Sequence, residues 1–279
     1  MPAILQFEFM IRALIGGAIV GALGPVLGMF LVLRRFSLIA DTLSHVALMG
    51  VAIGLATGVH PSLVALAAAT AGAIAVEYLS SRQRLPGDVT LAIVLYSSLA
   101  VAVVIISGAR GFSVDLFAFL FGSILSVSEL DLLLLGGLAA AVFIYVTVFF
   151  SELSQASFDP SLARVTGVRV GWVNLGLAIL TGATITLSMR VVGVLLVGAL
   201  LVVPVLAGER LVSGLRAALG VGVAVGIASA IVGLTVAFYA DLSAGGAIVL
   251  TAVVLLFIAQ GYAALRDRRR PLPGAPSDF

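Results

Sequence analysis

Long apolar runs, each close to the length of a membrane span, follow one another along almost the whole chain. A helix needs about 20 mostly apolar residues to cross the hydrocarbon core of a bilayer. Only His60 and Pro61 divide two of the runs, so the pattern predicts eight or nine transmembrane helices. The runs are 9–33, 38–58, 59–80, 88–107, 130–151, 170–189, 191–209, 214–239 and 244–265.

One apolar piece, VDLFAFLFGSILSVS at 114–128, is too short and too interrupted to span. We expect it to form a re-entrant or surface-lying helix. No clean internal repeat divides the chain. The predicted fold is therefore an all-α, polytopic membrane protein with a single transmembrane domain over 1–270, followed by a disordered tail at 271–279 (PLPGAPSDF).

The composition agrees with a membrane protein. Apolar residues make up 62% of the chain and charged residues only 10%, and the mean hydropathy is +1.26. A soluble domain carries about 25% charged residues, so this chain has too few to cover a water-facing surface. It has no cysteine, which excludes disulfides and thiolate metal ligands.

The fifteen basic residues are all arginine, and most of them lie in the breaks between apolar runs. With nine spans, twelve of them fall on the side of the C-terminal RDRRR (266–270), while Arg12, Arg110 and Arg190 lie on the other side. Arginine accumulates on the cytoplasmic side of membrane proteins. We therefore expect a cytoplasmic C-terminus and an extracytoplasmic N-terminus. The net charge of +2 reflects topology and gives no reason to expect a nucleic-acid partner.

The second apolar run carries a carboxylate and an imidazole one helical turn apart, Asp41 and His45, within RRFSLIADTLSHVALMGVAIG (34–54). Residues i and i+4 share one face of a helix, and Ser37 falls on that face too. The next turns of the same face carry Leu48, Ala52 and Ala56. A ridge of small residues lies on the opposite side and predicts close helix packing there: Gly50, Gly54 and Gly58.

A carboxylate inside a membrane costs about 2.5–3.5 kcal/mol on insertion scales, so it is usually paired or functional. One Asp and one His are too few for a tight metal site, but a two-fold dimer would supply two oxygens and two nitrogens. Such a set suits zinc, or manganese or ferrous iron with added water. The spacing also allows a structural pair, in which Asp41 accepts a hydrogen bond from His45 or pairs with Arg35.

Five segments, in order, resemble the membrane permease subunits of bacterial zinc and manganese ABC importers. LVLRRFSLIADTLSHVALMGVAIG (31–54) resembles the family signature. The other four are VDLFAFLFGSILSVSELDL (114–132), FDPSLARVTGV (158–168), VVGVLLVGALLVVPVLAGERL (191–211) and DLSAGGAIVL (241–250).

The resemblance implies a homodimeric channel in the bacterial cytoplasmic membrane. Two cytoplasmic ABC ATPase subunits would bind below the channel, and an extracytoplasmic metal-binding protein would deliver the ion. The family's metal-contacting residues map onto Asp41 and His45, which would hold the metal transiently, with no permanently bound cofactor. The motif D-T-L-S-H-V-A-L resembles the zinc members of the family more than the manganese members. It therefore favours zinc as the substrate, with manganese and iron as alternatives.

The longest polar stretch, 151–169, lies on the arginine-rich side. Asp159 followed by Pro160 is typical of a helix start, and Gly167 of a helix end, so we expect a short helix from Ser161 to Thr166. By itself this helix could simply reverse the chain. The resemblance implies a cytoplasmic coupling helix that docks into the ATPase, with the following residues as contacts: Phe158, Asp159, Pro160, Ala163 and Gly167.

Enzymatic chemistry is not expected. The chain has no lysine and no G-x-x-x-x-G-K-[ST] loop, so ATP hydrolysis must come from a separate subunit. Two rivals to the importer stay open: a proton-coupled secondary transporter that uses Asp41 and His45 as a relay, and a structural membrane protein. Three other polar residues have ordinary default roles. His60 and Asp241 are expected in solvated turns, and Glu77 is expected to reach toward water from a helix end.

Overall fold

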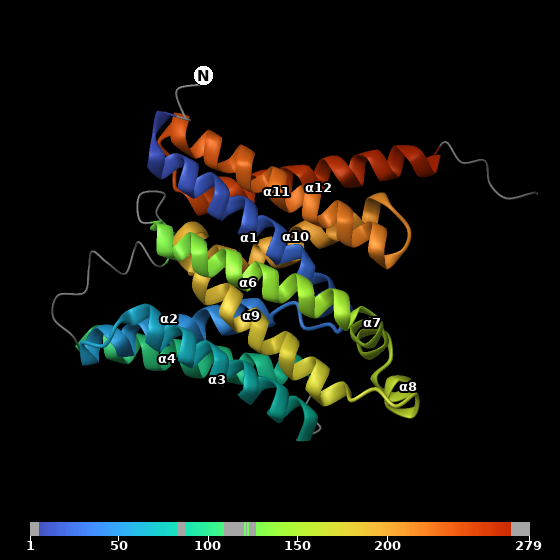
Figure 1. Ribbon diagram of the computed structural model, residues 1–279, viewed down its shortest axis with the longest axis horizontal. Helices are drawn as coiled ribbons and strands as arrows, with labels where there is room; N and C mark the ends of the chain where they lie inside the picture. Colours follow the sequence, from blue (N-terminus) through green and yellow to red (C-terminus); the bar gives the residue numbers. More distant parts are fainter. Residues whose placement is uncertain (1–5, 83–86, 109–119, 121, 123–126, 269–279) are drawn as a thin grey trace, which may run out of the picture.

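The computed structural model describes residues 6–82, 87–108, 120, 122 and 127–268, and Figure 1 shows that this part is helical. The expected helix at 114–128 lies almost entirely outside the described residues, and so does the tail at 271–279. The described helices are α1 (Glu8–Leu33), α2 (Ile39–Thr57), α3 (Pro61–Arg82), α4 (Gly87–Gly108), α6 (Glu129–Val148), α7 (Phe150–Phe158), α8 (Pro160–Val165), α9 (Val170–Val192), α10 (Val194–Leu211), α11 (Leu215–Ala240) and α12 (Ala244–Arg268).

Eight of the described helices are long and apolar enough to cross a membrane, which confirms the predicted all-helical membrane fold. The ninth long helix, α10, has 18 residues and corresponds to the expected run at 191–209. The boundary between α9 and α10 differs from the expected one because α9 continues to Val192. Gly193 then breaks the helix with φ 89°, a conformation that glycine adopts without steric cost.

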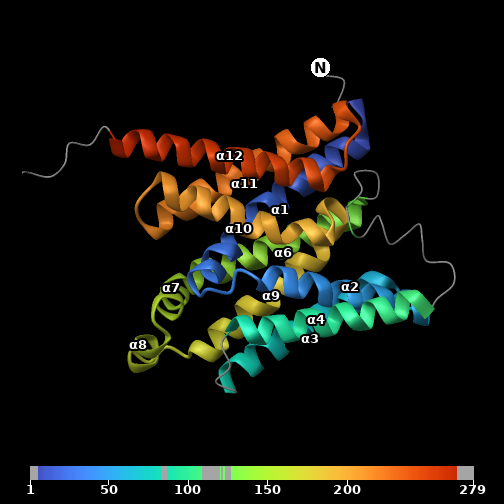
Figure 2. The ribbon, with the colours of Figure 1, turned by 180° about the vertical axis from the view of Figure 1, so that it is seen from behind.

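The nine long helices run in alternating directions, so the described bundle has two distinct ends (Figures 1 and 2). We call the end that holds α8 and the last turn of α12 the arginine-rich end, because most of the described arginines occur in its turns and helix ends. They include Arg34, Arg35, Arg164, Arg169, Arg210, Arg216 and Arg266. We call the other end, where α1 begins, the opposite end.

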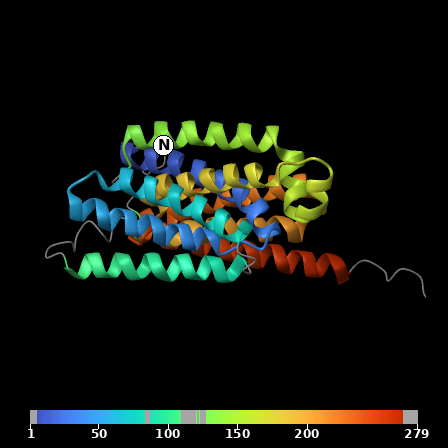
Figure 3. The same cartoon turned by 90° about the horizontal axis from the view of Figure 1, so that it is seen from below.

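The interior forms around α1, which packs against α6, α9, α10 and α11. Glycine allows these backbones to approach closely. A Cβ atom on Gly21 would overlap the backbone of Gly226 in α11, and one on Gly28 would overlap Leu201 in α10. In Figure 3, α6 (green) covers one face of the bundle, and α4 (teal) and α12 (red) lie on the opposite face.

Helix α2 is enclosed by α3, α4, α9 and α10. The close packing expected at its glycine ridge is made with α3: a Cβ on Gly50 would come within 2.6 Å of Ala65 Cα, and one on Gly54 within 2.7 Å of Pro61 Cα. Gly58 instead ends the helix in the left-handed conformation, with φ 72°. These contacts fix the rotation of α2 and leave a narrow part of its surface uncovered.

Candidate metal-binding residues and coupling segment

Asp41 lies in the first turn of α2. The chain enters this helix through Arg35, whose positive φ of 59° turns it away from the end of α1. The N-terminal end of a helix carries a partial positive charge, which stabilises a carboxylate in the first turn. The local structure therefore offsets part of the cost of placing Asp41 in a membrane-spanning helix.

The carboxylate of Asp41 lies directly against α10. A Cβ atom on Gly198 would overlap Asp41 Oδ1 and come within 3.4 Å of Asp41 Cγ. Glycine at position 198 therefore provides the room that the carboxylate occupies. No local sequence pattern indicates this contact, because the two positions are 157 residues apart along the chain.

His45 is half-buried, and its Nδ1 atom is buried without a hydrogen-bond partner. Among the described residues, no hydrogen bond joins His45 to Asp41, and the ion pairs do not include one between Asp41 and Arg35. The alternative of a self-satisfied structural pair is therefore not what the described chain adopts. Since an imidazole nitrogen without a partner can accept a ligand, the pair keeps coordination capacity.

In the described chain, one copy brings one carboxylate and one imidazole to this place. In the described ranges, no group of three or more His, Cys, Asp or Glu side chains is arranged to hold a metal ion. Any metal held at Asp41 and His45 must complete its coordination with water or with groups from another molecule.

A line of partly exposed residues runs along α2 and includes both candidates. From Ile39 to Ala52, every residue is buried except Asp41, His45 and Met49. Of the residues expected on the same face, Ser37 and Ala56 are exposed, whereas Leu48 and Ala52 are buried. The uncovered surface follows the i+4 row, which is inclined to the helix axis and therefore drifts around the helix.

The segment expected to contact the ATPase forms two helices, α7 and α8. The Asp159 carboxylate caps α8 and accepts hydrogen bonds from the backbone N–H groups of Ser161 (2.9 Å) and Leu162 (3.0 Å). Pro160 occupies the first turn, as expected. At the other end, Gly167 adopts φ 90°, and Val168 N–H donates to Ala163 O in the 6→1 pattern that closes a helix. The predicted short helix is confirmed in this form, while α7 before it was not anticipated.

The sides of α8 differ in character. Ala163 is buried against Ala156 and Val170, which attaches α8 to α7 and α9. Phe158, at the end of α7, and Leu162 are exposed, and Val165 is 85% exposed. The arginine-rich end therefore presents apolar side chains that the described chain does not cover.

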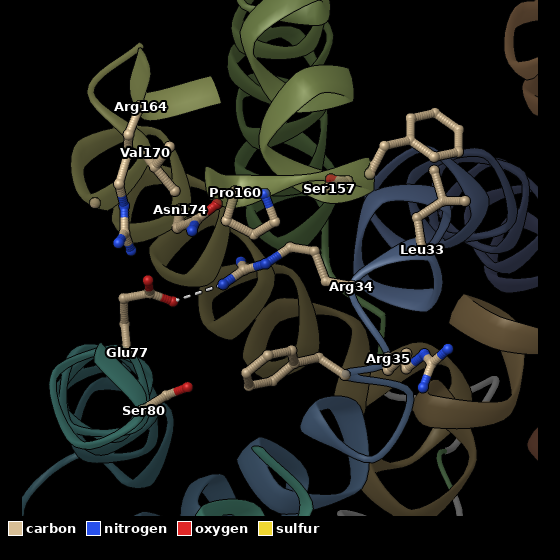
Figure 4. Close-up of a pocket in the computed structure, with 13 residues that line it drawn as sticks. Leu33, Arg34, Arg35, Glu77, Ser80, Ser157, Pro160, Arg164, Val170 and Asn174 are labelled. Atoms are coloured by element: carbon tan, nitrogen blue, oxygen red, sulfur yellow. Dashed lines mark hydrogen bonds and ion pairs between the residues drawn. The ribbon is translucent and has the colours of Figure 1, made fainter. Parts of the chain in front are cut away.

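A pocket of about 470 Å³ lies between α8 and the turn that leads into α2 (Figure 4). Arg34 and Glu77 form an ion pair of 3.1 Å there, and their side chains are only 10% and 13% exposed. The expectation that Glu77 would reach toward water was wrong, because the side chain turns inward to Arg34. The pocket is lined by Leu33, Arg34, Arg35, Phe36, Glu77, Ser80, Ser157, Phe158, Pro160, Arg164, Val170, Gly171 and Asn174.

A second polar group lies at the opposite end. Arg190 of α9 donates to the Asp131 carboxylate of α6 (3.1 and 3.2 Å) and to Ser62 Oγ of α3 (3.0 Å). Ser128 and Asp131 also form a capping box at the start of α6. His60, an exposed residue, shares a pocket of about 400 Å³ with this group. The sequence spacing Ser-x-x-Asp could have indicated the cap, but not the arginine that joins it.

The last polar residue singled out in the sequence, Asp241, has the role expected of a turn residue. It is exposed and ends α11 in the left-handed conformation, with φ 52°.

The described part of the chain has nine long helices, and on one of them the Asp-His pair makes no hydrogen bond to other described residues. These features define a polytopic membrane protein with a candidate ion-binding surface. Comparison with known proteins gives the family. The ABC 3 transport family model matches residues 6–263, and the chain belongs to this family.

Relatives named for two different metals are similar to nearly the full chain. The manganese import system permease protein ScaB of Streptococcus gordonii is 31% identical over 94% of both chains. The high-affinity zinc uptake system membrane protein ZnuB of Haemophilus influenzae is 32% identical over 91% of this chain and 97% of that protein. The solved structure of PsaBC from Streptococcus pneumoniae in complex with Fab aligns with a TM-score of 0.79 and 30% identity, over 94% of this chain and 97% of that one. The resemblance to zinc and manganese permeases is confirmed.

Proposed function

We propose that this chain is the membrane permease subunit of an ATP-driven importer for a divalent metal, and that Asp41 and His45 hold the metal transiently. The observation that carries the proposal is the unbonded state of the pair. His45 Nδ1 has no partner in the described chain, and Asp41 lies one turn away on the same uncovered row. Membership of the ABC 3 transport family supports ATP-driven transport.

The permease works as a homodimer in this proposal. A single chain supplies one carboxylate and one imidazole, and a two-fold axis beside α2 would bring two of each together. Four such ligands suit a first-row divalent ion. Conduction also requires that the ion leave again, so a coordination shell open to water serves transport better than a tight, closed site.

Zinc is the favoured substrate, and manganese and iron are the alternatives. The imidazole ligands favour zinc, while carboxylate and water also suit manganese. Sequence identity does not separate the two metals, because relatives named for manganese and for zinc are 31% and 32% identical to this chain.

The two ends of the bundle take different partners. Two cytoplasmic ATPase subunits would dock at the arginine-rich end, where Phe158, Leu162 and Val165 are exposed around α8. An extracytoplasmic metal-binding protein would deliver the ion at the opposite end. In this orientation the C-terminus lies in the cytoplasm. The membrane is the bacterial cytoplasmic membrane in this proposal. No step needs a permanently bound cofactor.

The test is metal uptake into vesicles that contain the full complex with its ATPase subunits. We expect uptake to require ATP on the side of the vesicle membrane where the ATPase subunits are bound. We also expect it to be lost in Asp41→Ala and in His45→Ala. Uptake by this chain alone, driven by a pH gradient, would instead support a proton-coupled transporter. Unchanged uptake in both variants would leave Asp41 and His45 without a role in transport.

A further inference from the structure

The uncovered row of α2 contains a third side chain with a metal-binding atom, Met49. The neighbours of Met49 in sequence, Leu48 and Gly50, are buried, whereas Met49 is partly exposed like Asp41 and His45. Between Ile39 and Ala52, the residues that the surrounding helices leave partly exposed are Met49, His45 and Asp41, which form one i+4 row.

The positions along the helix give the order in which an ion would meet these side chains. At 1.5 Å per residue, Met49 lies about 6 Å beyond His45 and about 12 Å beyond Asp41 along the axis. Met49 is therefore too far from Asp41 to share an ion within one helix. Residues i and i+4 are neighbours, so Met49 and His45 can share one. Since α2 starts at the arginine-rich end, Met49 lies on the side of the opposite end.

The chemistry of the row changes along its length. The thioether of methionine is a soft ligand that favours zinc over manganese, whereas a carboxylate binds both ions. Methionine also has three rotatable side-chain bonds, which allow its sulfur to follow a moving ion. An ion that enters from the opposite end would meet sulfur and imidazole first, and imidazole and carboxylate next.

We propose that Met49 and His45 form an entry position for a soft divalent metal, before the ion passes to His45 and Asp41, and that Met49 favours zinc over manganese. This inference rests on the proposed function, because it concerns the same residues of α2. It assigns the order in which the ion meets them and the metal that they favour. It adds a residue that determines specificity.

The first experiment is zinc-edge X-ray absorption on the full-length chain in lipid nanodiscs loaded with zinc. The chain has no cysteine, so a sulfur neighbour of zinc can come only from one of its five methionines. We expect a sulfur neighbour in the wild type, its loss in Met49→Leu and its retention in Met29→Leu. Met29 is a matched control because it is fully buried in α1. No sulfur neighbour in the wild type, or one that persists in Met49→Leu, would overturn the proposal.

The second experiment separates this inference from the proposed function. Uptake of zinc and of manganese is measured in competition in the full complex with its ATPase subunits. We expect Met49→Leu to lower the zinc-to-manganese ratio by about tenfold, the smaller of the effects typical of losing a contact at a metal site. The control Met29→Leu should keep the ratio. An unchanged ratio in Met49→Leu would overturn the selectivity role of Met49 while ATP-driven uptake itself stands.

Discussion

The Asp131–Arg190 pair and the Asp41–His45 pair both lie on long helices of the described chain, and their hydrogen bonding differs. Asp131 accepts hydrogen bonds from Ser128 Oγ (2.7 Å), from Ser128 N–H (3.0 Å) and from Arg190 (3.1 Å). Asp41 and His45 make no such bonds in the described chain, although they too lie on a helix long enough to span a membrane. The hydrogen-bonding capacity of the Asp131–Arg190 pair is used within the described chain, and that of the Asp41–His45 pair is not. We call the first the saturated pair and the second the unsaturated pair.

This difference agrees with a structural role for the first pair and with the metal-binding role that we propose for the second. Buried polar groups in proteins are nearly always hydrogen-bonded, because an unpaired group loses its water without compensation. Arg190 and Asp131 satisfy one another and hold α3, α6 and α9 together at the opposite end. His45 keeps a nitrogen without a partner, which is understandable if a metal ion is its intermittent partner.

The strongest test of this contrast is removal of the unsaturated pair. We expect Asp41→Asn and His45→Ala each to reduce metal uptake by about 100-fold, at the upper end of losses seen at perturbed metal sites. The thermal stability should change little, because the wild-type side chains make no bonds to lose. Uptake into vesicles with the full complex, together with thermal unfolding of the same preparations, measures both quantities.

His60→Ala is the matched control, since His60 is the other of the two histidines of the chain and lies exposed at the opposite end. We expect it to leave uptake close to the wild-type rate. A loss of stability in His45→Ala with unchanged uptake would mean that the pair is structural after all.

Removal of one partner from the saturated pair should have the converse effect. Arg190→Met leaves the Asp131 carboxylate, which is 13% exposed, without its cation, and we expect a loss of about 2 kcal/mol in the free energy of unfolding. The double variant with Asp131→Leu should recover part of this loss. Arg12→Met is the control, because the Arg12–Glu129 pair is exposed and such pairs contribute about 0–1 kcal/mol. If Arg190→Met and Arg12→Met lowered the free energy of unfolding equally, the proposed role of Arg190 in joining α3, α6 and α9 would be contradicted.

A substitution at Gly198, next to the Asp41 carboxylate, should have a smaller effect on uptake and tests the position of Asp41 specifically. In Gly198→Ala, the added methyl group overlaps the Asp41 carboxylate and must displace it, so we expect uptake to fall by about tenfold. Gly136→Ala is the control, because a Cβ at this position in α6 meets nothing within 4 Å. Similar uptake in the two variants would show that the position of Asp41 does not depend on the room at Gly198.

The smallest effect is expected at the cap of α8. Asp159→Ala removes the acceptor for two backbone N–H groups and should destabilise this helix by about 1 kcal/mol, whereas Asp159→Asn retains a good cap. If α8 transmits the ATPase cycle, we expect Asp159→Ala to lower uptake by about threefold, with Asp159→Asn near the wild type. An equal reduction in both variants would assign the effect to the charge and not to the cap.

Much of the fold follows from local pattern. The apolar runs predicted the long helices, and the Asp-Pro start and the glycine end predicted α8, since span length and capping depend on neighbours in sequence. The rotation of α2 was only partly predicted. The glycines predicted close packing on their side of α2, but not that α3 is the helix that packs there. The burial of Leu48 was not predicted, because the local sequence does not encode how α3, α4, α9 and α10 surround α2.

The polar contacts between helices could not be predicted in the same way. Arg34 and Glu77 are 43 residues apart, and Arg190 and Asp131 are 59 apart. Nothing in the local sequence distinguishes these arginines from the others that mark the ends of spans. The Asp-His spacing identified the candidate ligands, while their lack of internal partners became visible only in the folded chain.

The most direct test of the central claim is the amount of zinc bound to the purified full-length chain. Wild type, Asp41→Ala and His45→Ala would be compared by elemental mass spectrometry after equal exposure to zinc. A site shared across a two-fold axis predicts about one zinc ion per two chains in the wild type, and its loss in both variants. Zinc that is retained in both variants would contradict the assignment of Asp41 and His45 as the metal ligands.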